Sequence, residues 1–257
     1  KPLSSTFAVD FSAYYIGEWR FFHNPTAIYL SGDYIAGDVI IEPKPQTFMY
    51  TPSFLVFFSP FMALDYQAAL NAFDFIQVLS MFALAFFIYK IAKGKDLFLG
   101  VIAALVILVL PFSSYYWGYA LGNAHVIQTT LIVAALYFGF AHKPLVSAFM
   151  LMLASFDPRV TLLSIPILLY YNRANLRKFV AGAAGFIVAF NVPFFFYNDI
   201  GFTFLQKRLK GDIIVAMYAY DWLPLIAVAT ITVVEALTFY SIRKGVSFSK
   251  KKTSNPV

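Results

Sequence analysis

Long apolar segments, separated by short stretches rich in charge, proline or glycine, constrain this chain of 257 residues more than any other feature. Hydrophobic residues make up 60% of the sequence and charged residues only 12%, about half of the share in soluble domains. A membrane-spanning helix needs ~20 apolar residues. We therefore predict an all-α polytopic membrane protein with about seven transmembrane helices, from apolar segments at 67–90, 96–112, 123–141, 143–156, 158–172, 179–197 and 222–241.

Little of the chain is left outside these segments. We predict a single membrane domain over 1–257, which comprises an outer region 1–66 with juxtamembrane helices, a transmembrane bundle 67–241 and a basic cytoplasmic tail 242–257. Two of the segments, 143–156 and 158–172, are short for full spans and are expected to form a tight helical pair. The absence of cysteine excludes disulfides and thiolate chemistry, and no two of the three histidines have the spacing of zinc ligands.

The placement of charge predicts the orientation of the chain. If 67–90 runs from outside to inside, the inner loops and the tail carry twelve of the 19 basic residues, and the outer parts carry ten of the 13 acids. The positive-inside rule favours this orientation over the reverse one. We therefore expect a multi-pass protein of the plasma membrane, and we explain the net charge of +6 by topology rather than by nucleic-acid binding.

Segment 48–64 is apolar but too short and too rich in proline for a full span. Counting it as a span would invert every later loop, so we predict a short helix that dips into the outer leaflet. Residues 1–47 then lie outside. We expect a preceding helix or a signal peptide, so that the sequence is truncated at its N-terminus.

The first polar candidates lie in DFSAYYIGEWRFF, residues 10–22. In a helix, Asp10, Tyr14 and Glu18 are spaced by four and share a face. One interpretation makes Asp10 an N-cap among interfacial aromatic residues. The other makes Asp10 a general base at the membrane surface.

Further candidates gather on the same predicted outer side. Asn123, His125 and Gln128 follow one another at the start of the span 123–141, either as ordinary interfacial residues or as ligands for a polar substrate. Arg159, in the stretch DPR, either closes a turn with Asp157 or acts as a clamp for a lipid phosphate. Lys207, Arg208 and Lys210 are candidates for the same clamp, and binding to anionic headgroups is the alternative.

Two acids lie inside predicted spans. Asp74 is near the outer boundary and Glu235 approaches the inner one, so they make a poor proton relay. They support the alternative functions, a transporter or flippase of a lipid-linked substrate. A non-catalytic membrane scaffold is a further alternative.

Several short motifs occur in a characteristic order. D-F-x-x-Y-Y-x-G and N-P-T-A-I-Y come first, then Y-T-P-S-F-L-x-F-F-x-P, G-N-A-H, and D-P-R before an apolar helix and N-R-A-N-L-R-K. Over about residues 8–180 this set resembles the polyprenol-phosphate-mannose-dependent mannosyltransferases of glycosyltransferase family 87, also called DUF2029. This family belongs to the glycosyltransferase C-type superfamily.

The resemblance implies a fold like that of the C-type glycosyltransferases and a catalytic aspartate at Asp10. The family's Y-P-P stretch matches residues 50–52 with threonine in place of the first proline, and its G-Q-x-N element matches residues 122–125 with altered residues. Its K-P element matches Asp157 and Pro158, where the base is lost and Arg159 follows. The implied function is transfer of a hexose, with mannose favoured, from a polyprenyl-phosphate donor to a glycan, glycolipid or protein acceptor at the outer face.

Direct inverting displacement needs few groups. One carboxylate takes the acceptor proton, and cations stabilise the leaving phosphate, so no acid catalyst is required. No cofactor is implied beyond the donor, and the metal requirement is open. Asp10 is the predicted base, and the predicted substrate-binding residues are Tyr14, Glu18, Tyr50, Asn123, His125, Gln128, Arg159, Lys207 and Arg208.

Overall fold

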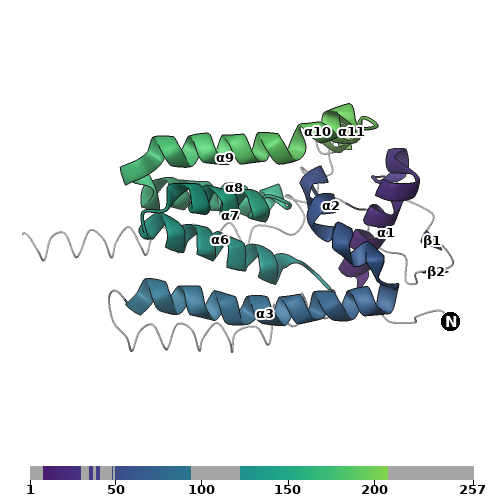
Figure 1. Cartoon of the computed structure of the whole chain (residues 1–257), viewed down its shortest axis with the longest axis horizontal. Helices are drawn as coiled ribbons and strands as arrows, with labels where there is room; N and C mark the ends of the chain where they lie inside the picture. The colour runs from purple at the N-terminus through teal and green to yellow at the C-terminus, as the bar shows by residue number, and fades with distance from the viewer. Residues whose placement is uncertain are drawn as a thin grey trace, which may run out of the picture. The chain divides into compact units, whose positions relative to one another are not determined.

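A computed structural model of the chain describes residues 8–29, 35–36, 39–40, 48, 50–93 and 122–207 (Figure 1). The described part is helical apart from one antiparallel pair of two-residue strands, β1 (Ile35–Ala36) and β2 (Val39–Ile40), with Ile35 opposite Ile40. It belongs to one compact unit, residues 1–207. The all-α prediction is therefore confirmed for these residues.

The opening aromatic stretch forms α1 (Val9–His23), as its spacing predicts. Residues 11–18 of α1 are all buried, so the helix lies within an aromatic core rather than on a surface. Ala8 is the N-cap, in the left-handed conformation, and no side chain caps the helix. The interpretation of Asp10 as an N-cap is therefore wrong, because Asp10 lies inside the first turn.

A short helical segment follows in place of a span. After the turn η1 (Pro25–Ala27), the apolar stretch forms α2 (Pro52–Phe58) and η2 (Ser59–Ala63), which confirms the predicted short helix. Pro52 suits the first turn of α2 because its missing N–H has no partner there.

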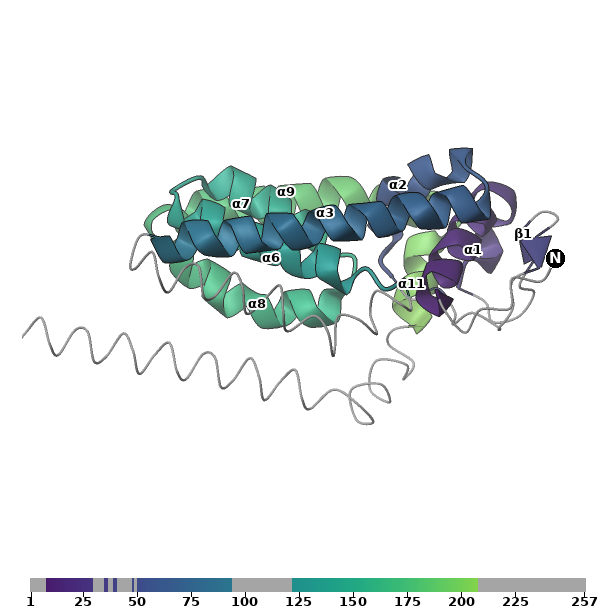
Figure 2. The ribbon, with the colours of Figure 1, turned by 90° about the horizontal axis from the view of Figure 1, so that it is seen from below.

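The longest helix, α3 (Tyr66–Lys93), contains neither glycine nor proline. Asp65 stabilises its start, since the backbone N–H of Ala68 donates to Asp65 Oδ1 at 2.8 Å. Alongside it pack α6 (His125–Phe140), α7 (Pro144–Ala154) and α8 (Pro158–Tyr171), with α3 against α6 and α6 against both α7 and α8 (Figures 1 and 2). Two short helices at 143–156 and 158–172 are thus confirmed, but the expected tight pairing is wrong, because α7 and α8 each pack against α6 rather than against each other.

The last described helices follow the turn η4 (Arg173–Asn175). They are α9 (Leu176–Asn191), which packs against α7, then α10 (Pro193–Phe196) and α11 (Ile200–Lys207). The predicted segment 179–197 is therefore divided, because Pro193 has no N–H for a continuous helix.

Two of the described helical stretches are long and apolar enough to cross a membrane, Tyr66–Ile91 and Arg173–Phe196. Only 17% and 11% of their most apolar windows are buried, whereas the core helix of a soluble protein would be covered. Their exposed apolar surface suits contact with lipid. The total of seven spans stays a prediction, and segments 96–112 and 222–241 lie outside the described residues.

Candidate functional site

The candidate site is centred on a contact between residues 113 positions apart in the chain. Asn123 Nδ2 donates a hydrogen bond to Asp10 Oδ2 over 2.7 Å. Asp10 is half-buried, so its carboxylate is accessible from outside the core. This bond joins the first turn of α1 to the residues that lead into α6.

The amide of Asn123 is oriented from both ends. The backbone N–H of His125 donates to Asn123 Oδ1 at 2.9 Å, which satisfies one of the unpaired N–H groups at the start of α6. The Nδ2 group is thereby directed at Asp10. Since α1 and α6 both begin here, two helix N-termini favour negative charge at Asp10.

Gly122 makes this approach of α6 to α1 possible. Its φ of +68° is costly for other residues. A Cβ at Gly122 would lie 2.6 Å from Phe11 Cβ, so even alanine would displace α6 from α1.

Two tyrosines extend the polar cluster. Tyr14 OH accepts the backbone N–H of Ala124 at 3.1 Å and donates to Tyr50 OH at 2.9 Å. Burial, chiefly, and then the neighbouring Tyr50 and Asp10 raise the pKa of Tyr14 well above its usual value. Tyr14 is therefore a neutral hydroxyl that fixes Tyr50 and the start of α6.

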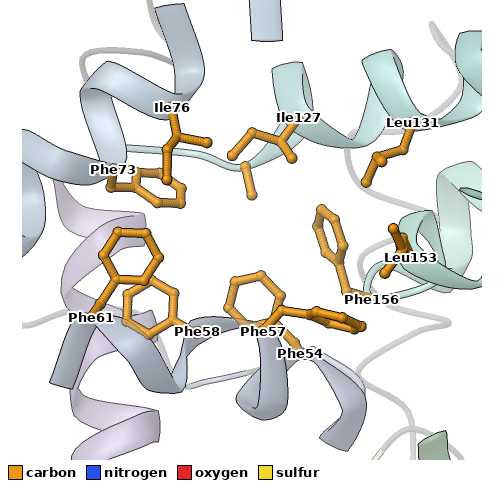
Figure 3. Close-up of a pocket in the computed structure, with 11 residues that line it drawn as sticks. Phe54, Phe57, Phe58, Phe61, Phe73, Ile76, Ile127, Leu131, Leu153 and Phe156 are labelled. Atoms are coloured by element: carbon orange, nitrogen blue, oxygen red, sulfur yellow. The ribbon is translucent and has the colours of Figure 1, made fainter. Parts of the chain in front are cut away.

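An apolar cavity of about 210 Å³ lies beside this cluster (Figure 3). Ala124, which binds Tyr14 through its N–H, lines the cavity directly after Asn123 in the chain. Phe54, Phe58 and Phe73 line it too, and their rings also contact Tyr14. The other lining residues are Phe57, Phe61, Ile76, Ile127, Leu131, Leu153 and Phe156. The polar cluster and the cavity lined by apolar residues thus share walls.

Glu18 is the least satisfied group on α1. Its side chain is fully buried, and neither carboxyl oxygen has a hydrogen-bond partner in the described part of the chain. Burial raises the pKa of Glu18 from about 4.5 to about 8. At neutral pH Glu18 is therefore a protonated acid, unlike the exposed carboxylate that a surface helix would carry.

Comparison with known protein families decides the identity of the chain. The sequence model of glycosyltransferase family 87 matches residues 48–219, about two thirds of the sequence. The chain belongs to glycosyltransferase family 87. No curated protein and no solved structure matches it.

The family assignment makes this chain a membrane glycosyltransferase. The matched range contains Tyr50, Asn123 and the cavity residues but begins after α1. Asp10 is therefore linked to the family region by its contact with Asn123 rather than by the match.

The structure gathers some predicted site residues of this family 87 chain and separates others. Asp10, Asn123, Tyr14 and Tyr50 form one bonded cluster. His125 joins it through its backbone N–H, and its ring is half-exposed. Glu18 has no described bond to the cluster.

The predicted cationic residues are only partly described. Lys207 is exposed at the end of α11, whose Phe204 packs on Tyr29, and Tyr29 OH donates to the Tyr50 carbonyl. Arg159 lies in the first turn of α8, and its side chain is outside what the structure describes, as are Arg208 and Lys210. Gln128 is fully buried and binds backbone carbonyls, not the cavity.

Sequence reasoning missed several residues that organise the site. Gly122 was recognised only as part of a motif, although glycine directly before a polar helix start is a signal for a close turn. The backbone bond from Thr51 N–H to the Phe156 carbonyl, 3.0 Å, had no local signal. Among the described residues no group of three or more histidine, aspartate or glutamate side chains is placed to hold a metal.

Proposed function

We propose that this glycosyltransferase moves a hexose, with mannose favoured, from a polyprenyl phosphate to an acceptor hydroxyl at the outer membrane face. The observation that carries the proposal is the half-buried Asp10 carboxylate, bound at 2.7 Å by Asn123 beside a cavity lined by apolar residues. A sugar donor on a lipid needs these two environments next to each other.

The reaction is a direct displacement. The acceptor oxygen attacks the anomeric carbon, the bond from that carbon to the phosphate oxygen breaks, and Asp10 takes the acceptor proton. Asn123 holds Asp10 in place for this step. The product has the inverted anomeric configuration, because a single displacement occurs.

The phosphate leaves as an anion and needs nearby positive charge rather than a proton. We assign this role to Arg159, Lys207 and Arg208. Arg159 comes three residues after Phe156, which lines the cavity. The start of α8 therefore lies next to the cavity wall, where we place the phosphate.

The prenyl chain is assigned to the cavity. Aromatic and aliphatic carbons line it, as Figure 3 shows, and each buried CH₂ of a ligand contributes about 0.8 kcal/mol. We assign five residues to binding of the sugar or the acceptor, either by direct contact or by holding the residues that make it: Tyr14, Tyr50, Asn123, His125 and Glu18.

The outer placement rests on charge. The end of α3, the α6–α7 turn and the α8–α9 junction lie at the end of the helices opposite α1 (Figure 1). These parts of the chain carry the exposed basic residues Lys90, Lys143, Arg173, Arg177 and Lys178. The positive-inside rule then favours Asp10 on the other side of the membrane.

Membranes containing the full chain test the proposal. They are incubated with radiolabelled polyprenyl-phosphate mannose, glucose or arabinose, and the labelled product is identified. We expect transfer from one donor, with kcat lowered at least about a hundredfold by Asp10→Asn.

Asp199→Asn is the matched control, because Asp199 is exposed and its φ of 53° suits asparagine. It should retain normal transfer. Normal activity of Asp10→Asn would remove Asp10 as the base, and no transfer from any of the donors would refute the proposed substrate class.

The transporter interpretation has one supporting observation. Asp74 Oδ1 is buried in α3 without a partner among the described residues, and Glu235 lies outside them. The family assignment favours the enzyme, so we do not propose transport or scaffolding.

A further inference from the structure

The turn between α7 and α8, residues 155–157, is held in place by hydrogen bonds from a side chain of a third helix. Gln128 Nε2, on α6, donates to the carbonyl oxygens of Ala154 at 2.9 Å and Asp157 at 2.7 Å. Gln128 is fully buried. One amide therefore bridges the end of α7 and the start of α8.

Pro158 explains why this bridge is needed. In a continuous helix the Ala154 carbonyl would accept the N–H of residue 158, but proline has none. Gln128 Nε2 replaces that donor, together with Thr161 Oγ1 at 2.8 Å. Thr161 Oγ1 also lies 3.0 Å from the Asp157 carbonyl oxygen, so its single hydroxyl hydrogen is shared between the two carbonyls that Gln128 binds.

On its other side the turn contacts the candidate site. The Phe156 carbonyl accepts the N–H of Thr51, the N-cap of α2, at 3.0 Å. The Phe156 ring lines the cavity beside Phe54 (Figure 3). Its ring centroid lies 5.1 Å from that of Phe54 and 6.0 Å from that of Tyr50. The turn is thus held between α6 and the start of α2, and it forms one wall of the cavity.

The start of α6 consequently makes two contacts that matter to the site. Asn123 binds Asp10, and Gln128, five residues later, binds the turn that leads into Arg159. Any shift of the turn along α6 changes the place of Phe156 and of the α8 start relative to Asp10.

We propose that Gln128 is a positioning residue for the donor's lipid phosphate. It acts through the backbone of residues 154–157 and thereby places Phe156 and Arg159 relative to Asp10. This inference rests on the proposed function. It differs from the predicted direct contact between Gln128 and the substrate, because the fully buried Gln128 side chain is not exposed to a ligand.

The test variant is Gln128→Met, which keeps the length of the side chain and removes the amide. The Thr161 hydroxyl lies within hydrogen-bond distance of both carbonyls and still donates its one hydrogen there, so the fold is expected to persist. Binding of decaprenyl phosphate to the purified full chain is measured together with the KM and kcat for the sugar donor. We expect weaker binding and a higher donor KM, each by about fivefold, with a smaller change in kcat.

Asn172→Leu is the matched control. Asn172 Nδ2 donates to Ser147 Oγ at 3.0 Å, a buried polar contact between the end of α8 and the start of α7, away from the cavity. Both variants should lower the unfolding temperature, but only Gln128→Met should change lipid-phosphate affinity. Equal changes in both variants, or an unchanged affinity in Gln128→Met, would overturn the inference.

A double variant tests the route through the turn. If Gln128 acts on Arg159, Gln128→Met should weaken binding less in an Arg159→Ala background than in the wild type, whereas full additivity would contradict that route. Should Gln128→Met fail to fold, Thr161→Val removes the second donor to the same carbonyls and is measured in its place.

The two proposals fail differently. A wild-type chain that binds decaprenyl phosphate but transfers no sugar would refute the proposed function, and the binding comparison would still decide the role of Gln128. A wild-type chain that transfers sugar, with wild-type affinity and KM in Gln128→Met, would refute only the positioning role. A wild-type chain that binds no decaprenyl phosphate overturns both.

Discussion

At the scale of single residues, the candidate base is defined by its neighbour. Asp10 lies in the first turn of α1, and the Asn123 amide that binds it is itself fixed by the His125 N–H. An amide donor keeps the carboxylate oriented without neutralising it, as a general base requires. Among the described residues, this oriented pair distinguishes Asp10 from Glu18, whose carboxyl oxygens have no hydrogen-bond partner.

Removing this donor should impair catalysis. We expect Asn123→Leu to lower kcat about tenfold or more, because Asp10 loses its orientation, and to destabilise α6 by about 1 kcal/mol through loss of the His125 N–H contact. Transfer kinetics and thermal unfolding in detergent measure the two effects. Asn191→Leu is the control, since Asn191 is half-buried and its amide donates to the Ile187 carbonyl of its own helix, α9. Equal kcat values in the two variants would contradict the role of Asn123.

Glu18 makes a prediction about pH. Below about pH 4.5 the carboxyl is protonated in both folded and unfolded chains, and between 4.5 and 8 only the unfolded chain ionises. Stability is therefore lost as the pH rises across this range. Glu18→Gln, a permanently neutral mimic, should gain stability over the wild type, on the order of a few kcal/mol by pH 8. Thermal unfolding at pH 5 and pH 8 measures the gain, and a difference that does not grow with pH would show that Glu18 is not held neutral.

Local spacing predicted part of the site and could not predict the rest. The four-residue repeat correctly placed Asp10, Tyr14 and Glu18 on one helix, but their surroundings depend on residues far away in the chain. Tyr14 binds Tyr50 and Ala124, whereas the buried Glu18 has no hydrogen-bond partner among the described residues. Periodicity describes the helix itself and carries no information on which partner faces each side chain.

At the scale of elements, apolar runs predicted the helices well and their junctions poorly. The short helix at 52–58, the long helix from 66 and the two short helices α7 and α8 appear where the sequence placed them, although α7 and α8 do not pack as a pair. The division at Pro193 and the start of α6 depended on single residues within apolar segments. Turn residues, rather than hydrophobicity, set these junctions.

Gly122 and Gly185 form a matched pair for testing the α6 start. Gly122→Ala should destabilise the protein by about 2 kcal/mol or more, because of its φ of +68° and the close Phe11, and should lower transfer by moving Asn123 from Asp10. At Gly185, within α9, an added Cβ meets nothing within 4 Å, so Gly185→Ala should leave stability unchanged or raise it by about 0.5–1 kcal/mol. Thermal unfolding and transfer assays on both variants decide the matter. Loss of stability in Gly185→Ala alone would refute this account of the α6 start.

At the scale of the whole molecule, the described unit has two chemically different ends. Asp10, the start of α6 and the α7–α8 turn gather near α1, and the exposed cations of the α6–α7 and α8–α9 connections lie at the other end of the helices (Figures 1 and 2). The apolar sides of α3 and α9 are exposed between them. Such a layout suits a protein whose chemistry and positive charge lie on opposite sides of a membrane.

The absence of cysteine makes this arrangement directly testable. Thr26→Cys introduces one thiol in the exposed turn after α1, and Lys143→Cys introduces one in the exposed α6–α7 turn. A membrane-impermeant maleimide should label Thr26→Cys in intact cells and Lys143→Cys only after permeabilisation, because the positive loops stay on the cytoplasmic side. Labelling of both thiols after permeabilisation is the internal control for reactivity. The reverse pattern would place Asp10 on the cytoplasmic side and would require a donor that is available there.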